Sequence, residues 1–338
     1  MPERAELIAA FLSGAGWGGA ARRPLAGDAS NRRYERLTDG LRTAVLMDAP
    51  AERGEDVRPF LAIARHLSGL GLSAPTILSA DPGAGLLLLE DLGDDLFVRV
   101  AARDPAQEET LYAAAVDLLA ELHRAPPPSG LGAYDAAAMA RLACLPFEWY
   151  LPGIDAPAPA PDGTSEAFRA GIETMLAEHA SPSVLILRDY HAENLIWLPA
   201  RQGFARVGLL DFQDALRGHP AYDLVSLLED ARRDVDPALQ SRMRARYVAA
   251  AGTPPDAFER AYALLGAQRN LRILGVFARL CLRDGKPGYL PLLPRVWGHL
   301  MRDLSHPDLA PLRAQVLDLI PPPEPALLDR IARKCPMR

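Results

Sequence analysis

Residues 184–198 read Val184-Leu-Ile-Leu-Arg-Asp-Tyr-His-Ala-Glu-Asn-Leu-Ile-Trp-Leu198, and residues 207–213 read Val207-Gly-Leu-Leu-Asp-Phe-Gln213. The pattern predicts an apolar strand, a polar loop, a second apolar strand, and then a third strand with an acidic end. Asp189, Asn194 and Asp211 stand at the ends of these strands. A loop held between two buried strands can fix a carboxylate and an amide a few ångströms apart.

The order Asp189, Asn194, Asp211 is typical of phosphoryl transfer, in which an Asp-x-x-x-x-Asn loop is followed by a second acid. Asp189 would accept the proton, or a hydrogen bond, from the attacking hydroxyl. Asn194 and Asp211 would offer oxygen ligands to Mg²⁺. The alternative is that all three are turn and strand-end residues. The flanking strands and the downstream Gly218-His-Pro-Ala-Tyr-Asp-Leu224 favour the catalytic hypothesis.

Composition indicates an ordinary globular protein of 338 residues, 49% hydrophobic and 24% charged, whose length suggests two lobes. The formal net charge of −6 argues against a nucleic-acid partner. Three widely spaced cysteines without a C-x-x-C pair favour a reducing compartment and exclude a zinc or disulfide framework. Without a visible secretory signal or a long apolar run, we expect a cytoplasmic protein that does not insert into membranes. The sequence does not identify protein partners.

The hydrophobic periodicity changes along the chain and predicts an α+β fold. It indicates a small antiparallel-sheet lobe over residues 1–92 and a larger, mainly helical lobe over 93–338. Asp39-Gly40 is a strong hairpin signal. The expected strands are 21–25, 33–37, 42–47, 75–80 and 85–89, and the expected helices are 3–13, 55–70, 110–123, 167–179, 225–230, 237–250, 255–283, 289–304, 309–319 and 325–333.

Two segments of the small lobe suit a nucleotide. The small and polar residues Gly27-Asp-Ala-Ser-Asn31 join two strands, and such a turn can direct backbone N–H groups onto phosphate oxygens. Leu86-Leu-Leu-Leu-Glu-Asp-Leu-Gly93 leaves the sheet at a glycine, so peptide groups from Glu90 to Leu92 could bind an adenine edge. The alternative for the first segment is a plain β-hairpin, and for the second it is a buried strand that ends at a glycine.

The whole chain resembles the aminoglycoside-phosphotransferase branch of the protein-kinase-like fold. Ser30-Asn-Arg-Arg-Tyr-Glu-Arg36 is similar to that branch's nucleotide-covering hairpin, and Leu88-Leu-Glu-Asp-Leu-Gly93 is similar to its hinge. The resemblance implies a two-lobed kinase that uses ATP and Mg²⁺. It assigns Asp189 to catalysis, Asn194 and Asp211 to the metal, and the five residues Asn31, Arg32, Arg33, Glu90 and Leu92 to ATP.

Within the branch, three stretches are most similar to bacterial kinases that phosphorylate N-acetylmuramate and N-acetylglucosamine at the anomeric hydroxyl, in peptidoglycan recycling. They are Leu187-Arg-Asp-Tyr-His-Ala-Glu-Asn194, Leu210-Asp-Phe-Gln-Asp-Ala215 and Gln268-Arg-Asn-Leu-Arg-Ile-Leu-Gly-Val-Phe277. The resemblance therefore implies a small amino-sugar substrate. Kinases of aminoglycosides, choline or homoserine, and a pseudokinase without transfer, are the alternatives.

Two positions depart from the family pattern. Leu187 stands where the wider family has a histidine, and we expect this to affect loop packing. Met47 stands where the family has its phosphate-binding lysine, and no lysine precedes Lys286. Arg33, with Arg32 next, is the candidate replacement, because a guanidinium fork suits phosphate oxygens and side chains alternate along a strand. Both could equally be solvated arginines.

Candidate acceptor contacts come from three places. Tyr190 and His191 lie inside the predicted catalytic loop, and Glu148 precedes Trp149 in Pro146-Phe-Glu-Trp-Tyr150. Arg269 and Asn270 interrupt an otherwise apolar helix and need polar partners. A lactyl carboxylate or an acetamide is one candidate partner, and an internal salt bridge is the other.

Overall fold

The computed structural model describes residues 3–25, 32–156 and 163–336. Contacts divide the chain into two compact units. Unit 1 comprises Met1–Pro128 and Leu187–Ala215, and unit 2 comprises Ser129–Ile186 and Leu216–Arg338. The boundary between the units therefore falls inside the 184–198 stretch. The expected lobe boundary after Leu92 stays a prediction.

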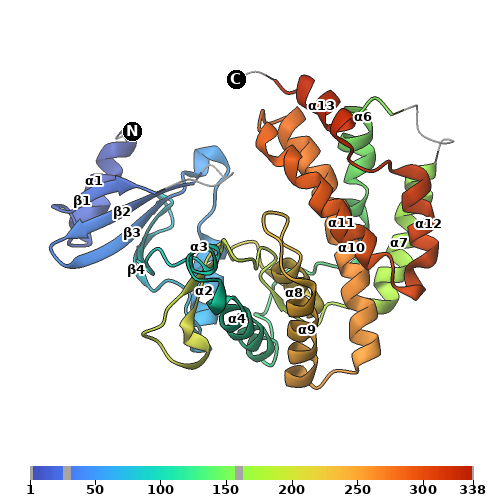
Figure 1. Cartoon of the computed structure of the whole chain (residues 1–338). Helices are drawn as coiled ribbons and strands as arrows, with labels where there is room; N and C mark the ends of the chain where they lie inside the picture. The colour runs from blue at the N-terminus through green and yellow to red at the C-terminus, as the bar shows by residue number, and fades with distance from the viewer. Residues whose placement is uncertain (1–2, 26–31, 157–162, 337–338) are drawn as a thin grey trace. The chain divides into compact units, whose positions relative to one another are not determined.

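A five-stranded antiparallel sheet forms the N-terminal part of unit 1 (Figure 1), with strand order β1-β2-β3-β5-β4. The β2–β3 hairpin turns at Gly40 and Leu41, and Gly40 has a φ of 60°, which glycine adopts at no steric cost. The strands are β1 (Ala21–Pro24), β2 (Arg33–Asp39), β3 (Arg42–Asp48), β4 (Ile77–Asp81) and β5 (Leu86–Glu90).

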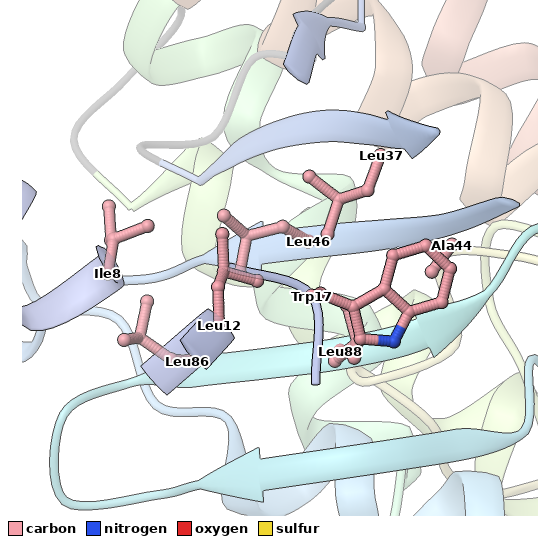
Figure 2. Packing of buried hydrophobic residues seen from close by; sticks show 8 residues of the cluster. All are labelled: Ile8, Leu12, Trp17, Leu37, Ala44, Leu46, Leu86 and Leu88. Atoms are coloured by element: carbon pink, nitrogen blue, oxygen red, sulfur yellow. The ribbon is translucent and has the colours of Figure 1, made fainter. Parts of the chain in front are cut away.

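One face of this sheet is covered by helix α1 (Arg4–Gly14) and the residues that follow it. Figure 2 shows Ile8, Leu12 and Trp17 packed against side chains of the central strands. The strand members of this cluster are Leu37, Ala44, Leu46, Leu86 and Leu88. Burying each large aliphatic side chain contributes about 1.5–3 kcal/mol. Since alternate residues point to opposite faces, Met47 faces away from α1.

The remainder of unit 1 supports a two-stranded hairpin, in which β7 (Leu195–Trp197) pairs with β8 (Val207–Leu209). Isolated bridges connect Ser73 to Gly208 and Leu96 to Ile196, so the N-terminal segment holds both strands. Phe60 also stacks on Phe212, with ring centroids 4.8 Å apart. The helices of this part are α2 (Arg58–Gly69), α3 (Phe97–Arg103) and α4 (Glu108–Leu122).

Unit 2 is built around the long helix α10 (Pro255–Leu282), which contacts α5, α7, α8, α11 and α13 (Figure 1). At Gly275 a Cβ atom would lie 2.4 Å from backbone and side-chain atoms of Leu145, so only glycine permits this close approach. The other helices are α5 (Ala136–Ala143), α6 (Leu151–Gly153), α7 (Thr164–His179), α8 (Ala221–Leu228), α9 (Pro237–Ala251), α11 (Leu293–Asp303), α12 (Ala310–Leu319) and α13 (Pro325–Arg333).

The predicted α+β class, with an antiparallel sheet followed by helices, is confirmed. Helices α3 and α5 and the π-helical turn Pro146–Tyr150 lie in segments for which the sequence pattern predicts no element. The structure also adds β9 (Leu216–Gly218), which pairs with β6 (Val184–Ile186). Among the described residues, no helix combines the length and apolarity needed to cross a bilayer.

Candidate active site

The loop between β6 and β7 is turned tightly by its own backbone. The N–H of Asp189 donates to the carbonyl of Leu187 at 2.9 Å, and the N–H of His191 donates to that of Asp189 at 3.1 Å. Arg188 and Asp211 have φ values of 71° and 55°, in the left-handed region that residues with a Cβ rarely adopt. Such backbone strain clusters at functional sites, because the surrounding structure must hold it.

Asn194 brings the three predicted catalytic residues together within unit 1. Its Nδ2 donates to the backbone carbonyl of Asp189 at 2.9 Å and lies 3.5 Å from Oδ2 of Asp211. Its own carbonyl accepts from the N–H of Leu210 at 3.0 Å, which ties the end of β7 to the end of β8. None of these bonds uses Oδ1 of Asn194, which leaves that oxygen for another ligand.

Asp211 is oriented by a residue that sequence reasoning missed. Gln213 donates its Nε2 to Oδ1 of Asp211 at 2.7 Å. An oriented carboxylate beside an amide oxygen is a donor set that suits Mg²⁺, which binds through one or two carboxylates and completes its shell with water and phosphate oxygens. Asn194 and Asp211 therefore fit the predicted metal.

Tyr190 and His191 are both buried, with 1% and 6% of their surface exposed. The hydroxyl of Tyr190 donates to the backbone carbonyl of Ala115 in α4 at 2.9 Å, so its side chain anchors the loop. The expected contact of Tyr190 with the acceptor stays a prediction. Nε2 of His191 lies 3.4 Å from Nδ2 of Asn194, which places the imidazole beside the amide.

The two nucleotide candidates Glu90, at the end of β5, and Leu92, just after it, differ in their hydrogen bonds. The side chain of Glu90 is engaged, because Arg201 donates to Oε1 at 2.5 Å and the Thr76 hydroxyl donates to Oε2 at 2.8 Å. The N–H of Leu92 has no hydrogen-bond partner in the described part of the chain. Leu92 therefore offers a backbone donor, whereas the carboxylate of Glu90 has a structural role.

The segment after β5 is held by Arg36, another residue outside the sequence-based candidates. Its Nε lies 2.8 Å from Asp91 and its Nη1 lies 2.6 Å from Asp94. The hydrogen bond with Asp94 raises the pKa of Arg36 against the opposing effect of burial, and it lowers the pKa of Asp94. Gly93, with a φ of 87°, donates its N–H to Asp91 at 3.0 Å.

Arg32 and Arg33 lie on opposite sides of the sheet. Side chains alternate between the two faces of a sheet. Arg33 is therefore on the same face as Leu37, which packs against α1. Arg32 is on the same face as Tyr34, whose cross-strand partner is Met47. Nε of Arg32 donates to Oε2 of Glu55 at 2.8 Å, with both side chains mostly buried. Burial lowers the pKa of Arg32, but Tyr34 and Glu55 outweigh it and raise that pKa overall.

Residues 26–31, which include Asn31 and the whole Gly27–Asn31 connection, lie outside the described part of the chain. Arg32 is the first described residue after this gap. It stands on the face of the sheet where the missing lysine was expected, because Met47 occupies that face.

Three acceptor candidates lie in unit 2. Glu148 is exposed in the π-helical turn that packs against α10, and it interacts electrostatically with Arg279. Arg269 and Asn270 are buried in α10. The Asn270 amide donates to Glu229 at 2.9 Å and to Asp303 at 3.0 Å, so it meets carboxylates of its own chain.

Glu229 and Asp303 form a buried acid pair. Burial raises the pKa of each carboxyl above its ordinary value, and for Asp303 the neighbouring charge of Glu229 raises it further. The Asn270 amide partly offsets this by favouring the charged forms. The folded protein therefore keeps a proton on the pair at pH values where the unfolded chain has lost it.

Comparisons with known proteins show the family of the chain. A family model described as the phosphotransferase enzyme family matches residues 21–264. A protein of Caulobacter vibrioides named N-acetylmuramate/N-acetylglucosamine kinase is 43% identical, over 92% of this chain and 95% of that protein. A protein of the same name from Pseudomonas aeruginosa is 37% identical, over 86% of each chain.

Solved structures with this fold are more distant in sequence. An ADP-bound aminoglycoside phosphotransferase has a TM-score of 0.59 and 14% identity, covering 98% of each chain. The choline kinase of Streptococcus pneumoniae has a TM-score of 0.54 and 14% identity, covering 88% of this chain and all of that chain. At such identities they establish the protein-kinase-like fold alone.

The acid pair predicts a pH dependence of stability. As pH rises above the ordinary carboxyl pKa values of 3.8 and 4.5, the unfolded chain releases protons that the folded pair still holds. The free energy of unfolding should therefore decrease as pH rises through the raised pKa values. Asp303→Asn keeps the hydrogen bonds and removes one acid, so its decrease should be smaller. Thermal unfolding from about pH 4 upward, where the unfolded carboxyls begin to lose their protons, measures this difference.

Asp318→Asn is the control, because Asp318 is exposed on α12. It should follow the wild-type pH profile. Identical profiles for the wild type and Asp303→Asn would show that the pair holds no shared proton.

Proposed function

The chain belongs to the phosphotransferase enzyme family, and on that premise we propose that it phosphorylates N-acetylmuramate and N-acetylglucosamine with ATP. Curated relatives at 34–43% identity carry the name of that activity, and they align over most of this chain. The observation that carries the proposal is the Asn194 amide, which contacts both the backbone of Asp189 and the carboxylate of Asp211.

In the proposed reaction, Asp189 orients the anomeric hydroxyl and takes its proton as the oxygen attacks the γ-phosphorus in line. The bond from O1 to phosphorus forms, the bond from phosphorus to the β,γ-bridging oxygen breaks, and ADP leaves. An anomeric hydroxyl is more acidic than the other sugar hydroxyls, so modest help from a base is sufficient.

Asn194, through Oδ1, and Asp211 would hold Mg²⁺, which when bound neutralises charge on the phosphates. Gln213 keeps the Asp211 carboxylate oriented for this task. Val207–Leu209 pairs with Leu195–Trp197, so both ligands sit at ends of one hairpin and share its rigidity.

For the nucleotide, we propose that the N–H of Leu92 and the peptide groups from Glu90 onward bind the adenine edge. Arg32 takes the place of the missing lysine. It has the Glu55 partner that orients its guanidinium, and a planar fork matches phosphate oxygens. Asn31 and Arg33 remain candidates for the flap, and Arg33 lies on the opposite side of the sheet from Arg32.

For the acceptor, we propose contacts from Tyr190 and His191, which lie in the same loop as Asp189. Glu148, Arg269 and Asn270 stay candidates from the sequence. A cationic acceptor such as an aminoglycoside or choline would need unpaired acidic groups. The acids next to Asn270 instead share its amide, and burial raises the pKa of each of them. Phosphorylated cell-wall sugars would return to biosynthesis in the cytoplasm, where ATP is available.

The reaction predicts a sugar phosphate without a reducing end. With ATP and Mg²⁺, the protein should convert N-acetylglucosamine to a product whose phosphorus is coupled to C1 in nuclear magnetic resonance spectra. Asp189→Asn should lower turnover by roughly a hundredfold to ten-thousandfold, because the general base is lost, and should bind ADP as the wild type does.

Aminoglycosides and choline are the comparison acceptors and should give no product. Phosphorylation of those alone would contradict the proposed substrate class. Near-normal turnover by Asp189→Asn would contradict the role given to that carboxylate.

The arginine replacement gives a second prediction. Arg32→Met should raise the KM for ATP by about tenfold or more, because a charge-assisted contact to phosphate is lost. Steady-state kinetics with varied ATP measure this change, and Glu55→Gln should shift the same parameter in the same direction.

Arg65→Met is the control, since it removes an exposed arginine of α2 that is not among the candidate nucleotide contacts. Its KM for ATP should stay within about twofold of wild type. An equal effect of both methionine variants would mean that general charge, and not the Arg32–Glu55 pair, serves the phosphates.

A further inference from the structure

The β7–β8 hairpin, whose ends carry the candidate metal ligands, also contacts the segment that leaves the sheet after β5. We define Glu90–Gly93 as the hinge segment. Arg201 lies in the connection between β7 and β8, and its Nη2 donates to Oε1 of Glu90 at 2.5 Å. Both residues belong to unit 1. This ion pair therefore joins the two regions of unit 1 to which the proposed reaction assigns the adenine and the metal.

Both members of this ion pair have further partners. Nη1 of Arg201 donates to the hydroxyl of Ser73 at 2.6 Å, and that hydroxyl donates to the backbone carbonyl of Ala205 at 2.7 Å. Oε2 of Glu90 accepts from the hydroxyl of Thr76 at 2.8 Å. The side chains of Arg201 and Glu90 are 33% and 29% exposed. A partly buried pair within a hydrogen-bond network is less screened and better ordered than an isolated surface ion pair.

The hinge segment is also attached to β7 on its other side. The carbonyl of Asp95 accepts from the N–H of Trp197 at 2.8 Å. This attachment follows Gly93, whose φ of 87° lies in the left-handed region, and it uses backbone atoms alone. The Arg201–Glu90 ion pair precedes Gly93 and uses side chains. The two attachments together fix both ends of the hinge segment against the hairpin.

Each of the two regions has internal supports as well. Arg36 pairs with Asp91 and Asp94 and so holds the segment after β5. Gln213 orients the carboxylate of Asp211. Loss of the Arg201 side chain would leave these contacts in place. It would change the separation of the two regions and leave each region able to bind its own part of a nucleotide.

We propose that Arg201 is a positioning residue that sets the separation between the hinge segment and the metal ligands Asn194 and Asp211. The proposal rests on the proposed function, in which the hinge segment binds adenine and the metal binds the phosphates. A ligand with two linked parts gains from both contacts only when the two regions are held at the separation that the ligand spans. Arg201 acts on the nucleotide through Glu90.

The test compares a nucleotide with its two parts. Arg201→Met should weaken the binding of ADP with Mg²⁺ by at least about fivefold, because ADP contacts both regions at once. Adenosine, which meets only the hinge segment, and magnesium pyrophosphate, which meets only the metal ligands, should each bind within about twofold of wild type. Competition with a fluorescent ADP analogue measures all three affinities.

Two further variants test the pair itself. Arg201→Lys keeps the charge but not the planar fork that reaches both Glu90 and Ser73, so it should recover part of the ADP affinity. Glu90→Gln should weaken ADP binding in the same direction as Arg201→Met. The double variant should lose little more than Arg201→Met alone, as expected for two partners of one contact.

Arg206→Met is the matched control, because Arg206 is an exposed arginine of the same hairpin that lies over the ring of Trp197. It should leave all three affinities within about twofold of wild type.

Equal weakening of ADP, adenosine and magnesium pyrophosphate in Arg201→Met would overturn the proposal, because a residue that only supports the fold does not distinguish a nucleotide from its parts. Unchanged ADP affinity in Arg201→Met would also overturn it. A wild type that binds no ADP in the presence of Mg²⁺ would instead overturn the proposed function.

Discussion

The candidate active site depends on the two contacts made by one side-chain amide. Asn194 reaches the backbone of Asp189 on one side and, seventeen positions along the chain, the carboxylate of Asp211 on the other. The amide can do this because β7 and β8 pair directly after it and directly before Asp211. The bridges from Ser73 and Leu96, and the Phe60–Phe212 stack, hold the hairpin against the rest of unit 1. Arg188 and Asp211 adopt left-handed backbone conformations, which are unfavourable for residues with a Cβ. The contacts of the hairpin with the rest of unit 1 hold them in these conformations.

The scarcity of lysine constrains the electrostatics of the nucleotide side. Both lysines lie in unit 2, at Lys286 and Lys334, so a permanently charged side chain of unit 1 that meets phosphates is an arginine. Arg32 has its own acid, Glu55, and stands on the same side of the sheet as Met47. A guanidinium keeps its charge under burial where an ammonium can lose it, which suits a position whose neighbours are mostly buried. Arg36 meets Asp91 and Asp94 in the same unit, and so fixes the segment after β5 without a lysine.

Much of this arrangement could be predicted from the sequence because its signals are local. The strands of the sheet and the loop that carries Asp189 and Asn194 follow from hydrophobic alternation and turn residues, and they match the structure closely. The β6–β9 pair could not be predicted, since β9 is short and its partner is distant in the chain. The hydrogen bond from Tyr190 to Ala115 could not be predicted, because sequence position within a loop does not reveal on which side of the backbone a ring packs. Asn270 needed the tertiary structure as well, because its partners Glu229 and Asp303 come from two other segments.

Binding of Mn²⁺, which prefers the same oxygen ligands as Mg²⁺, tests most directly whether Asn194 and Asp211 form a metal site. Electron paramagnetic resonance titration in the presence of ADP should show one Mn²⁺ site in the wild type. In Asp211→Asn its affinity should fall by at least about tenfold, because the charged ligand is lost. Asp214→Asn changes an exposed acid of the same turn and should bind Mn²⁺ as the wild type does. Unchanged Mn²⁺ affinity in Asp211→Asn would contradict the metal site, and with it the phosphoryl-transfer geometry built on the Asn194 amide.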